Sequence, residues 1–222
     1  MDKLIGRHKE QLILKNCLES GRSEFVVIYG RRRIGKTFLV RRFFNDTYDF
    51  SFVGKHEMPR EQQLADFAKT LQRYSSSEFA PELKNWTQAF DGLAKLLEAK
   101  DTSRKKVIFF DEMPWMDTPK SDFVSSLENF WNGWAAMRDD IVFVACGSAT
   151  SWMIDSLLHN QGGLFNRITR KIYLRPFRLY EVEQYMDEHH FNWSRYQIAQ
   201  CYMILGGVPF YLTLLNPHMS LL

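Results

Sequence analysis

The sequence predicts an α/β protein built on a mainly parallel β-sheet with helices on both faces. Short apolar runs rich in β-branched and aromatic residues alternate along the chain with longer segments whose apolar residues recur at helical spacing. A glycine-containing turn joins the first apolar run directly to a helical segment. Parallel strands need a crossover connection, so this alternation is typical of a sheet covered on both sides.

Five apolar segments predict the strands. Each is short and almost wholly apolar, which is typical of a strand buried on both faces. In chain order they are Phe25–Tyr29, Tyr48–Val53, Val107–Phe110, Ile141–Ala145 and Ile172–Leu174. Apolar residues at helical spacing predict helices between them, around 64–71, 86–97 and 123–134.

The strand-like pattern stops before the end of the chain. Beyond it only helical spacing remains, at 182–186 and 198–205. We therefore place a domain boundary near Phe177, which divides the chain into a core at 1–177 and a helical segment at 178–222.

Length and composition limit the class of protein. A chain of 222 residues with 45% hydrophobic residues can form one α/β domain with a small appendage. No apolar run approaches the roughly 20 residues of a membrane span, and the start lacks an apolar secretory segment. Cys17, Cys146 and Cys201 are far apart and odd in number, which favours neither a disulfide framework nor a metal cluster. We expect a reduced, cytoplasmic protein.

Basic residues are distributed unevenly. The net charge is only +3, yet residues 1–60 hold 13 Lys and Arg against 7 Asp and Glu. Residues 162–180 hold basic residues and no acidic one. Basic patches suit any polyanion, from the phosphates of a nucleotide to a nucleic acid, so charge alone does not select the partner.

The turn after the first predicted strand matches the pattern G-x-x-x-x-G-K-[ST], between a strand and a helix as the motif requires. Glycines allow successive backbone N–H groups to point at phosphate oxygens, and the helix N-terminus adds partial positive charge. Lys36 would reach the β- and γ-phosphates, and the Thr37 hydroxyl would bind Mg²⁺. We expect the arginine side chains of the loop to point outward into solvent. The expected nucleotide-binding residues are Gly30, Arg31, Arg32, Arg33, Ile34, Gly35, Lys36, Thr37 and Phe38.

An acidic pair follows the third predicted strand. The segment VIFFDEMPW ends its apolar run at Asp111 and Glu112. Carboxylates at the carboxyl end of a buried parallel strand would lie beside the phosphate loop. We expect Asp111 to hold the Mg²⁺ shell and Glu112 to orient or deprotonate the attacking water.

The fourth predicted strand ends in Gly147 and Ser148. If this strand lies between the first and third, Ser148 faces the γ-phosphate or the attacking water. The alternative role for Ser148 is a helix N-cap, for which Thr150 and Ser151 compete.

Two histidines occur side by side in a helical pattern near the C-terminus. His189 and His190 lack acidic or cysteine partners at metal-binding spacing, so we interpret both as surface residues.

The motifs together resemble the archaeal-type ATPase family of P-loop proteins, which is close to the AAA+ and signal-transduction (STAND) ATPases. The resemblance rests on IGRHKEQ, YGRRRIGKTFLV, FFDEMPW, ACGSATSWM, NRITRKIYLRPF and LGGVPFYL, which occur in the family's order over nearly the whole chain. It implies a three-layer α/β/α P-loop fold with the sheet order 5-1-4-3-2 and a C-terminal helical lid.

The resemblance also implies further site residues. Gly6 and Arg7 would lead into the adenine pocket, and Pro209 in the GGVP segment would approach the nucleotide from the lid. Arg167 falls where relatives place a finger-like arginine, supplied in cis or by a neighbouring subunit, and Arg170 and Arg175 compete for this role. Such proteins usually continue into further domains, so we expect this chain to be a fragment.

These patterns favour an ATP-binding protein that hydrolyses ATP with Mg²⁺. Two alternatives are a nucleotide-gated switch or scaffold with little turnover, and an ATPase module acting on nucleic acid. ATP and ADP are the expected ligands, while a homo-oligomer, a nucleic acid and a C-terminal effector domain stay open as partners.

Overall fold

A computed structural model of the protein describes residues 4–101, 103–158, 162–164 and 166–218. Its five strands form one parallel sheet in the order β2-β3-β4-β1-β5, which confirms the predicted order read from the opposite edge. The strands are β1 (Glu24–Tyr29), β2 (Phe50–Val53), β3 (Lys106–Asp111), β4 (Ile141–Gly147) and β5 (Arg170–Tyr173).

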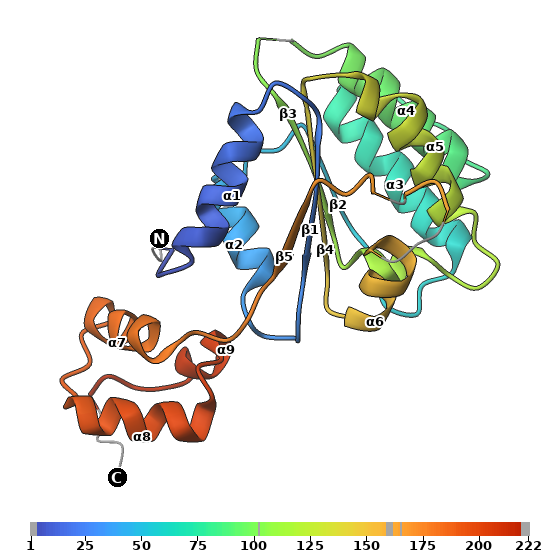
Figure 1. The fold of residues 1–222 in the computed structure, drawn as a ribbon. Helices are drawn as coiled ribbons and strands as arrows, with labels where there is room; N and C mark the ends of the chain where they lie inside the picture. The colour runs from blue at the N-terminus through green and yellow to red at the C-terminus, as the bar shows by residue number, and fades with distance from the viewer. Residues whose placement is uncertain (1–3, 102, 159–161, 165, 219–222) are drawn as a thin grey trace.

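The sheet forms the middle of three layers, because successive residues of each strand point to opposite faces. Val26, Phe109 and Val144 pack against α1 (His8–Glu19) and α2 (Lys36–Phe43). Figure 1 shows these two helices on one side of the sheet and three further helices on the other.

The second face carries the larger core. It contacts α3 (Arg60–Ser75), α4 (Trp86–Glu98) and α5 (Phe123–Gly133) through closely packed aromatic rings. Phe110, for example, lies 5.0 Å from Phe143 and 6.0 Å from Phe90, measured between ring centroids. Helices on both faces of a parallel sheet whose central strands are buried confirm the predicted fold class.

Short helical turns join some of these elements. They are η1 (Met113–Met116), η2 (Ala135–Met137), α6 (Thr150–Trp152) and the π-helical turn η3 (Met153–Leu158).

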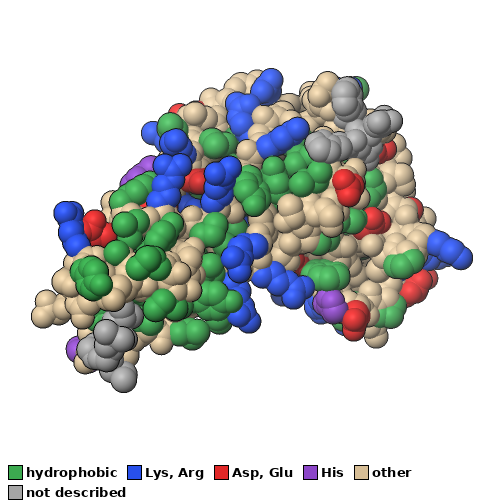
Figure 2. Space-filling view, turned by 60° about the horizontal axis from the view of Figure 1, so that its bottom comes forward, with side chains coloured by type: hydrophobic (Ala, Val, Ile, Leu, Met, Phe, Trp, Pro, Cys, Tyr) green, Lys and Arg blue, Asp and Glu red, His purple; other side chains and the backbone are tan. Residues whose placement is uncertain are grey.

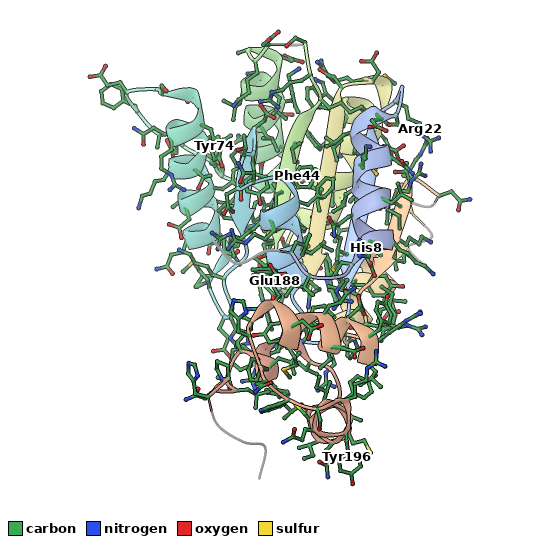
Figure 3. All side chains as sticks on the ribbon, turned by 90° about the vertical axis from the view of Figure 1, so that its left-hand side faces the viewer. His8, Arg22, Phe44, Tyr74, Glu188 and Tyr196 are labelled. Carbon is green, nitrogen blue, oxygen red and sulfur yellow. The ribbon has the colours of Figure 1, made fainter. Side chains whose placement is uncertain are left out.

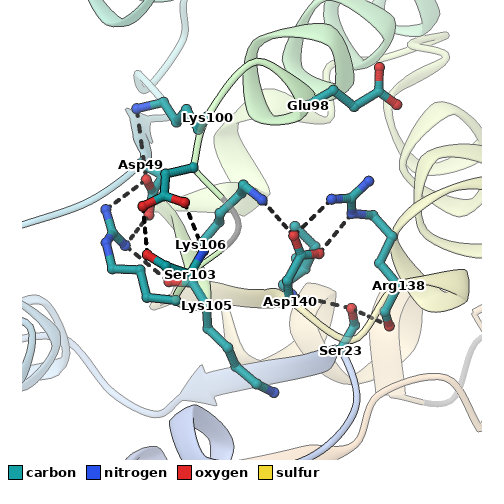
Figure 4. A network of polar contacts seen from close by, with 12 residues as sticks. Ser23, Asp49, Glu98, Lys100, Ser103, Lys105, Lys106, Arg138 and Asp140 are labelled. Atoms are coloured by element: carbon teal, nitrogen blue, oxygen red, sulfur yellow. Dashed lines mark hydrogen bonds and ion pairs between the residues drawn. The ribbon is translucent and has the colours of Figure 1, made fainter.

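Each strand differs from its predicted range by one or two residues at one end or both, and the start of the second strand has a clear structural reason. The predicted second strand began at Tyr48, whereas β2 begins at Phe50. The Val107 N–H donates to the Asp49 carboxylate at 2.9 Å rather than to a backbone carbonyl of a neighbouring strand, so regular pairing starts only after Asp49. The same carboxylate also accepts hydrogen bonds from the Arg104 guanidinium. These contacts belong to a polar network at the amino end of the sheet (Figure 4).

A helical segment follows β5 and has a small apolar cluster of its own. It consists of α7 (Leu179–Glu188), α8 (Arg195–Leu205) and α9 (Pro209–Leu212). Figure 1 shows the segment beyond the carboxyl end of the sheet, and Figure 3 places Glu188 at its junction with the core and Tyr196 at its outer side. The domain boundary at residue 177 stays a prediction, and residues 1 and 222, the predicted outer limits, lie outside the described ranges.

Among the residues that the structure describes, no helix is both long enough and apolar enough to cross a membrane. The three cysteines are free and buried.

Candidate nucleotide site

The loop between β1 and α2 needs glycine at both ends. Gly30 has φ of 142°, and a Cβ atom there would lie 2.5 Å from the Leu174 carbonyl oxygen. Gly35 has φ of 85° and directly precedes α2, which begins at Lys36. L-residues rarely adopt these angles, so the glycines allow the loop to close over the N-terminus of the helix, where anions bind readily.

Lys36 is the buried cation at the end of this loop. Its side chain is buried, and its Nζ donates to the carbonyl oxygens of Gly30 at 2.9 Å and Arg31 at 3.0 Å. Burial lowers the pKa of the Lys36 ammonium, while the nearby charge of Glu112 opposes that shift. Neutral carbonyls compensate a buried ammonium only in part, so a phosphate group beside it would be stabilised.

Thr37 and Asp111 meet at the end of β3. The Thr37 hydroxyl donates to Asp111 Oδ2 at 2.7 Å, and Asp111 is buried. Burial raises the pKa of the Asp111 carboxyl, and the hydrogen bond from Thr37 opposes the rise. Two oxygen ligands on a buried anionic site suit Mg²⁺, which is usually held by one or two protein oxygens together with phosphates and water. No group of three or more His, Cys, Asp or Glu side chains able to hold a metal occurs in the described ranges.

Glu112 lies beside Ser148 because β3 and β4 are neighbours in the sheet. Glu112 Oε2 accepts from the Ser148 hydroxyl at 2.9 Å and from the Ser148 N–H at 3.4 Å. Glu112 also has a left-handed backbone, with φ of 46°. Ser148 does not cap the following helix, since the residue at the N-cap of α6 is Ala149, and no side chain caps that helix.

A cavity of about 420 Å³ opens beside these residues. Its phosphate-loop end is formed by Lys36, Thr37 and Glu112, among others. The remainder is mainly apolar and aromatic, and its lining residues include Leu4, Ile5, Phe177, Tyr185, His189, Pro209 and Phe210. Figure 2, turned toward this end of the molecule, shows Lys and Arg side chains gathered where the helical segment meets the core.

Arg7 connects the N-terminal segment, the phosphate loop and the helical segment. Its buried guanidinium donates to the Ile34 carbonyl at 3.3 Å and lies 4.7 Å from the centroid of Phe177. Its backbone N–H donates to Glu181 Oε1 at 3.1 Å. Gly6, the preceding residue, is buried with φ of 62°. Arg7 lines the cavity directly, whereas Gly6 is not among the lining residues, so its link to the site stays a prediction.

The three loop arginines are exposed, but Arg32 and Arg33 also line the cavity, so the expectation that all three point away into solvent is wrong for these two. Arg33 has further contacts. Its guanidinium lies 4.8 Å from the ring centroid of Phe210, and its carbonyl accepts from the Phe210 N–H at 3.3 Å. The loop is thus in direct contact with α9. Arg32, Ile34 and Phe38 also line the cavity.

Arg167 lies apart from this group. It is exposed, shortly before β5 begins at Arg170, and it is not among the residues that line the cavity. The site also contains residues that were not predicted from the sequence, namely Leu4, Ile5, Leu39, Phe177, Tyr185, His189, Phe210 and Thr213.

Comparisons with known proteins identify the family of the chain. Residues 4–215 match the model of an ATPase domain found predominantly in Archaea. The chain belongs to this family. A curated but uncharacterised protein of Methanocaldococcus jannaschii is 24% identical to the chain over 213 residues, which cover 94% of the chain and 43% of that protein. The chain thus spans less than half the length of this archaeal relative.

Solved structures of ATPases share the fold. A Walker-type ATPase of Pyrococcus abyssi is 18% identical, with a TM-score of 0.68 over 94% of this chain and 65% of the other. A STAND protein with a tetratricopeptide repeat sensor from Pyrococcus horikoshii is 20% identical, with a TM-score of 0.58 over 97% of this chain and 30% of the other.

Proposed function

We propose that this ATPase-family domain binds ATP in the cavity and hydrolyses it in a Mg²⁺-dependent reaction. The observation that carries the proposal is that phosphate-loop residues, Thr37 and Glu112 line one cavity with an apolar end, while Thr37 is hydrogen-bonded to Asp111. Such a cavity matches a ligand with a charged triphosphate and an aromatic base. ADP is then the product.

The chain's own residues supply positioning and charge. Lys36 and the loop N–H groups would bind the β- and γ-phosphates and neutralise the charge that develops as the γ-phosphoryl group transfers. Thr37 and Asp111 would hold Mg²⁺, which supplies further neutralisation of the phosphate oxygens when bound. Glu112 would orient the attacking water and receive its proton.

In this mechanism the Ser148 hydroxyl must exchange one hydrogen-bond acceptor for another. This hydroxyl has one hydrogen, and in the structure that hydrogen is donated to Glu112. Contact with the γ-phosphate requires the same hydrogen, so the hydroxyl cannot serve both acceptors at once. We infer that γ-phosphate binding draws the Ser148 hydroxyl away and frees Glu112 for water.

The hydrogen bond between Ser148 and Glu112 also favours a second function, a nucleotide-gated switch with slow turnover. While Ser148 holds Glu112, one carboxylate oxygen is engaged by two hydrogen bonds and is poorly placed to accept a proton from water. A switch would bind nucleotide tightly and respond mainly through the helical segment, which contacts the loop at Arg33.

The exposed position of Arg167 fits a role in trans better than in cis. As a finger it would act on the nucleotide of a neighbouring copy, which predicts turnover per chain that rises with protein concentration. Loss of this concentration dependence in Arg167→Ala would support the role, and an unchanged profile would remove it.

The test compares wild type with Glu112→Gln. We expect the variant to bind ATP with unchanged affinity and to hydrolyse it at least about 100-fold more slowly, since it cannot accept a proton. Hydrolysis at the wild-type rate would show that Glu112 is not the base. Tight binding with negligible turnover in both proteins would favour the switch.

A further inference from the structure

His189 occupies a defined position at the apolar end of the cavity. It follows the last residue of α7, and its side chain is half-buried in the cavity wall. The imidazole stacks on the ring of Tyr185, with centroids 4.0 Å apart and planes inclined by 21°. Its Nδ1 lies 2.9 Å from the Tyr185 carbonyl oxygen. Stacking and this hydrogen bond fix both the plane and the rotation of the ring.

The same hydrogen bond defines the chemistry of the other ring nitrogen. A carbonyl oxygen only accepts, so Nδ1 carries the hydrogen of the neutral ring, and Nε2 is left as an acceptor. Among the residues that the structure describes, none forms a hydrogen bond with Nε2. The neighbouring lining residues Leu4, Ile5 and Phe177 offer apolar side chains. An acceptor in such surroundings gains from a ligand that brings a donor.

An adenine nucleotide would bring a hydrogen-bond donor to the apolar end of the cavity. The phosphate loop fixes the triphosphate near Lys36, so the base extends into the apolar part of the cavity. Adenine carries an amino group at C6, whereas guanine and hypoxanthine carry a carbonyl oxygen at that position. A fixed acceptor therefore attracts adenine and repels the other two bases.

We propose that His189 selects the base of the nucleotide by accepting a hydrogen bond at Nε2 from the exocyclic amino group of adenine. This inference rests on the proposed nucleotide-binding function and adds a residue that determines base specificity. A site built to pair one hydrogen-bonding group rejects analogues that leave its polar atom unpaired or opposed. Other elements of the cavity wall supply shape and apolar contact.

The experiment measures dissociation constants for three Mg²⁺-nucleotides, namely ATP, purine riboside triphosphate, which lacks the amino group, and inosine triphosphate. Wild type should bind ATP about tenfold more tightly than purine riboside triphosphate, as one hydrogen bond allows, and inosine triphosphate more weakly still. In His189→Phe, which keeps the stacking on Tyr185, the three affinities should converge. His189→Gln restores an acceptor and should recover part of the preference.

The adjacent His190 gives a matched control. It is exposed and does not line the cavity, so His190→Phe should retain wild-type preferences. Equal discrimination in wild type and His189→Phe would overturn the inference while leaving nucleotide binding intact. Failure of wild type to bind any of the three triphosphates would overturn the proposed function and this inference together.

Discussion

The Thr37 hydroxyl donates a 2.7 Å hydrogen bond to the Asp111 carboxylate, although 74 positions separate the two residues along the chain. The contact joins the start of α2 to the end of β3, at the carboxyl end of the sheet. Residues brought together at this end of a parallel sheet form the binding site in open α/β folds. The pair thus links the phosphate loop to the acidic residues that follow β3.

Asp111→Asn should stabilise the protein without ligand and abolish its stabilisation by Mg²⁺ and ATP. Burial raises the pKa of the Asp111 carboxyl, which means that the ionised form destabilises the folded state. This loss of unfolding free energy is complete once pH has risen through the folded pKa, and it is present at neutral pH. A ligand at 100 times its Kd should add about 2.7 kcal/mol of stability to wild type and little to the variant.

Thermal unfolding at neutral pH, with and without Mg²⁺-ATP, measures both effects. The exposed Asp91→Asn serves as the control and should follow wild type throughout. An Asp111→Asn protein that gains full stabilisation from Mg²⁺-ATP would contradict the assigned metal-binding role.

Ser148→Ala should distinguish ATP from ADP. In the proposed mechanism the hydroxyl contacts only the γ-phosphate, and a hydrogen bond to a charged group contributes about 1.5–3 kcal/mol. The Kd of a slowly hydrolysed ATP analogue should therefore rise about tenfold or more, whereas that of ADP stays constant. Titration calorimetry with both nucleotides measures the difference. Equal weakening of both ligands would mean that Ser148 acts only through local structure.

Asp140→Asn should destabilise the fold far from the nucleotide site. Asp140 binds the buried Lys106 ammonium and the Arg138 guanidinium at the amino end of the sheet (Figure 4). Removing one partner of a buried ion pair costs about 3–5 kcal/mol, because the other charge stays buried. Urea unfolding at neutral pH measures this cost, and the exposed Asp139→Asn should change stability little.

The effect of Asp140→Asn should also depend on pH. Hydrogen bonding to Arg138 holds the pKa of the Asp140 carboxyl well below its usual range. A depressed folded-state pKa contributes stability above the unfolded pKa, about 3.9, and loses it as pH falls toward the folded value. The difference in unfolding free energy between wild type and variant should therefore shrink below about pH 4. A constant difference at all pH values would argue against the ion pair as its cause.

The sequence predicts the phosphate loop and the acidic pair because each depends on a local pattern. Gly30, Gly35 and Lys36 are neighbours in the chain, and their strand–loop–helix context can be read from apolar periodicity. Asp111 follows a buried strand for the same reason. The sheet order came from the family resemblance, and the structure confirms it.

The apolar end of the cavity could not be predicted in this way. Arg7 and Glu181 are 174 positions apart, and no local pattern links them. His189 and His190 look alike in sequence, and both were interpreted as surface residues. The structure places only His190 in that class, because the end of α7 turns His189 into the cavity wall. Which residue of a helix end faces a cavity depends on how the helix packs, and that information is not local.

The most direct test of the account is phosphate release from ATP by the purified chain, measured with Mg²⁺, with a chelator and in Lys36→Ala. We predict release by wild type with Mg²⁺, and none above background in the other two conditions, because both the ammonium at the phosphates and the metal are required. Equal release by wild type and Lys36→Ala would place any ATP hydrolysis outside this cavity and contradict the account.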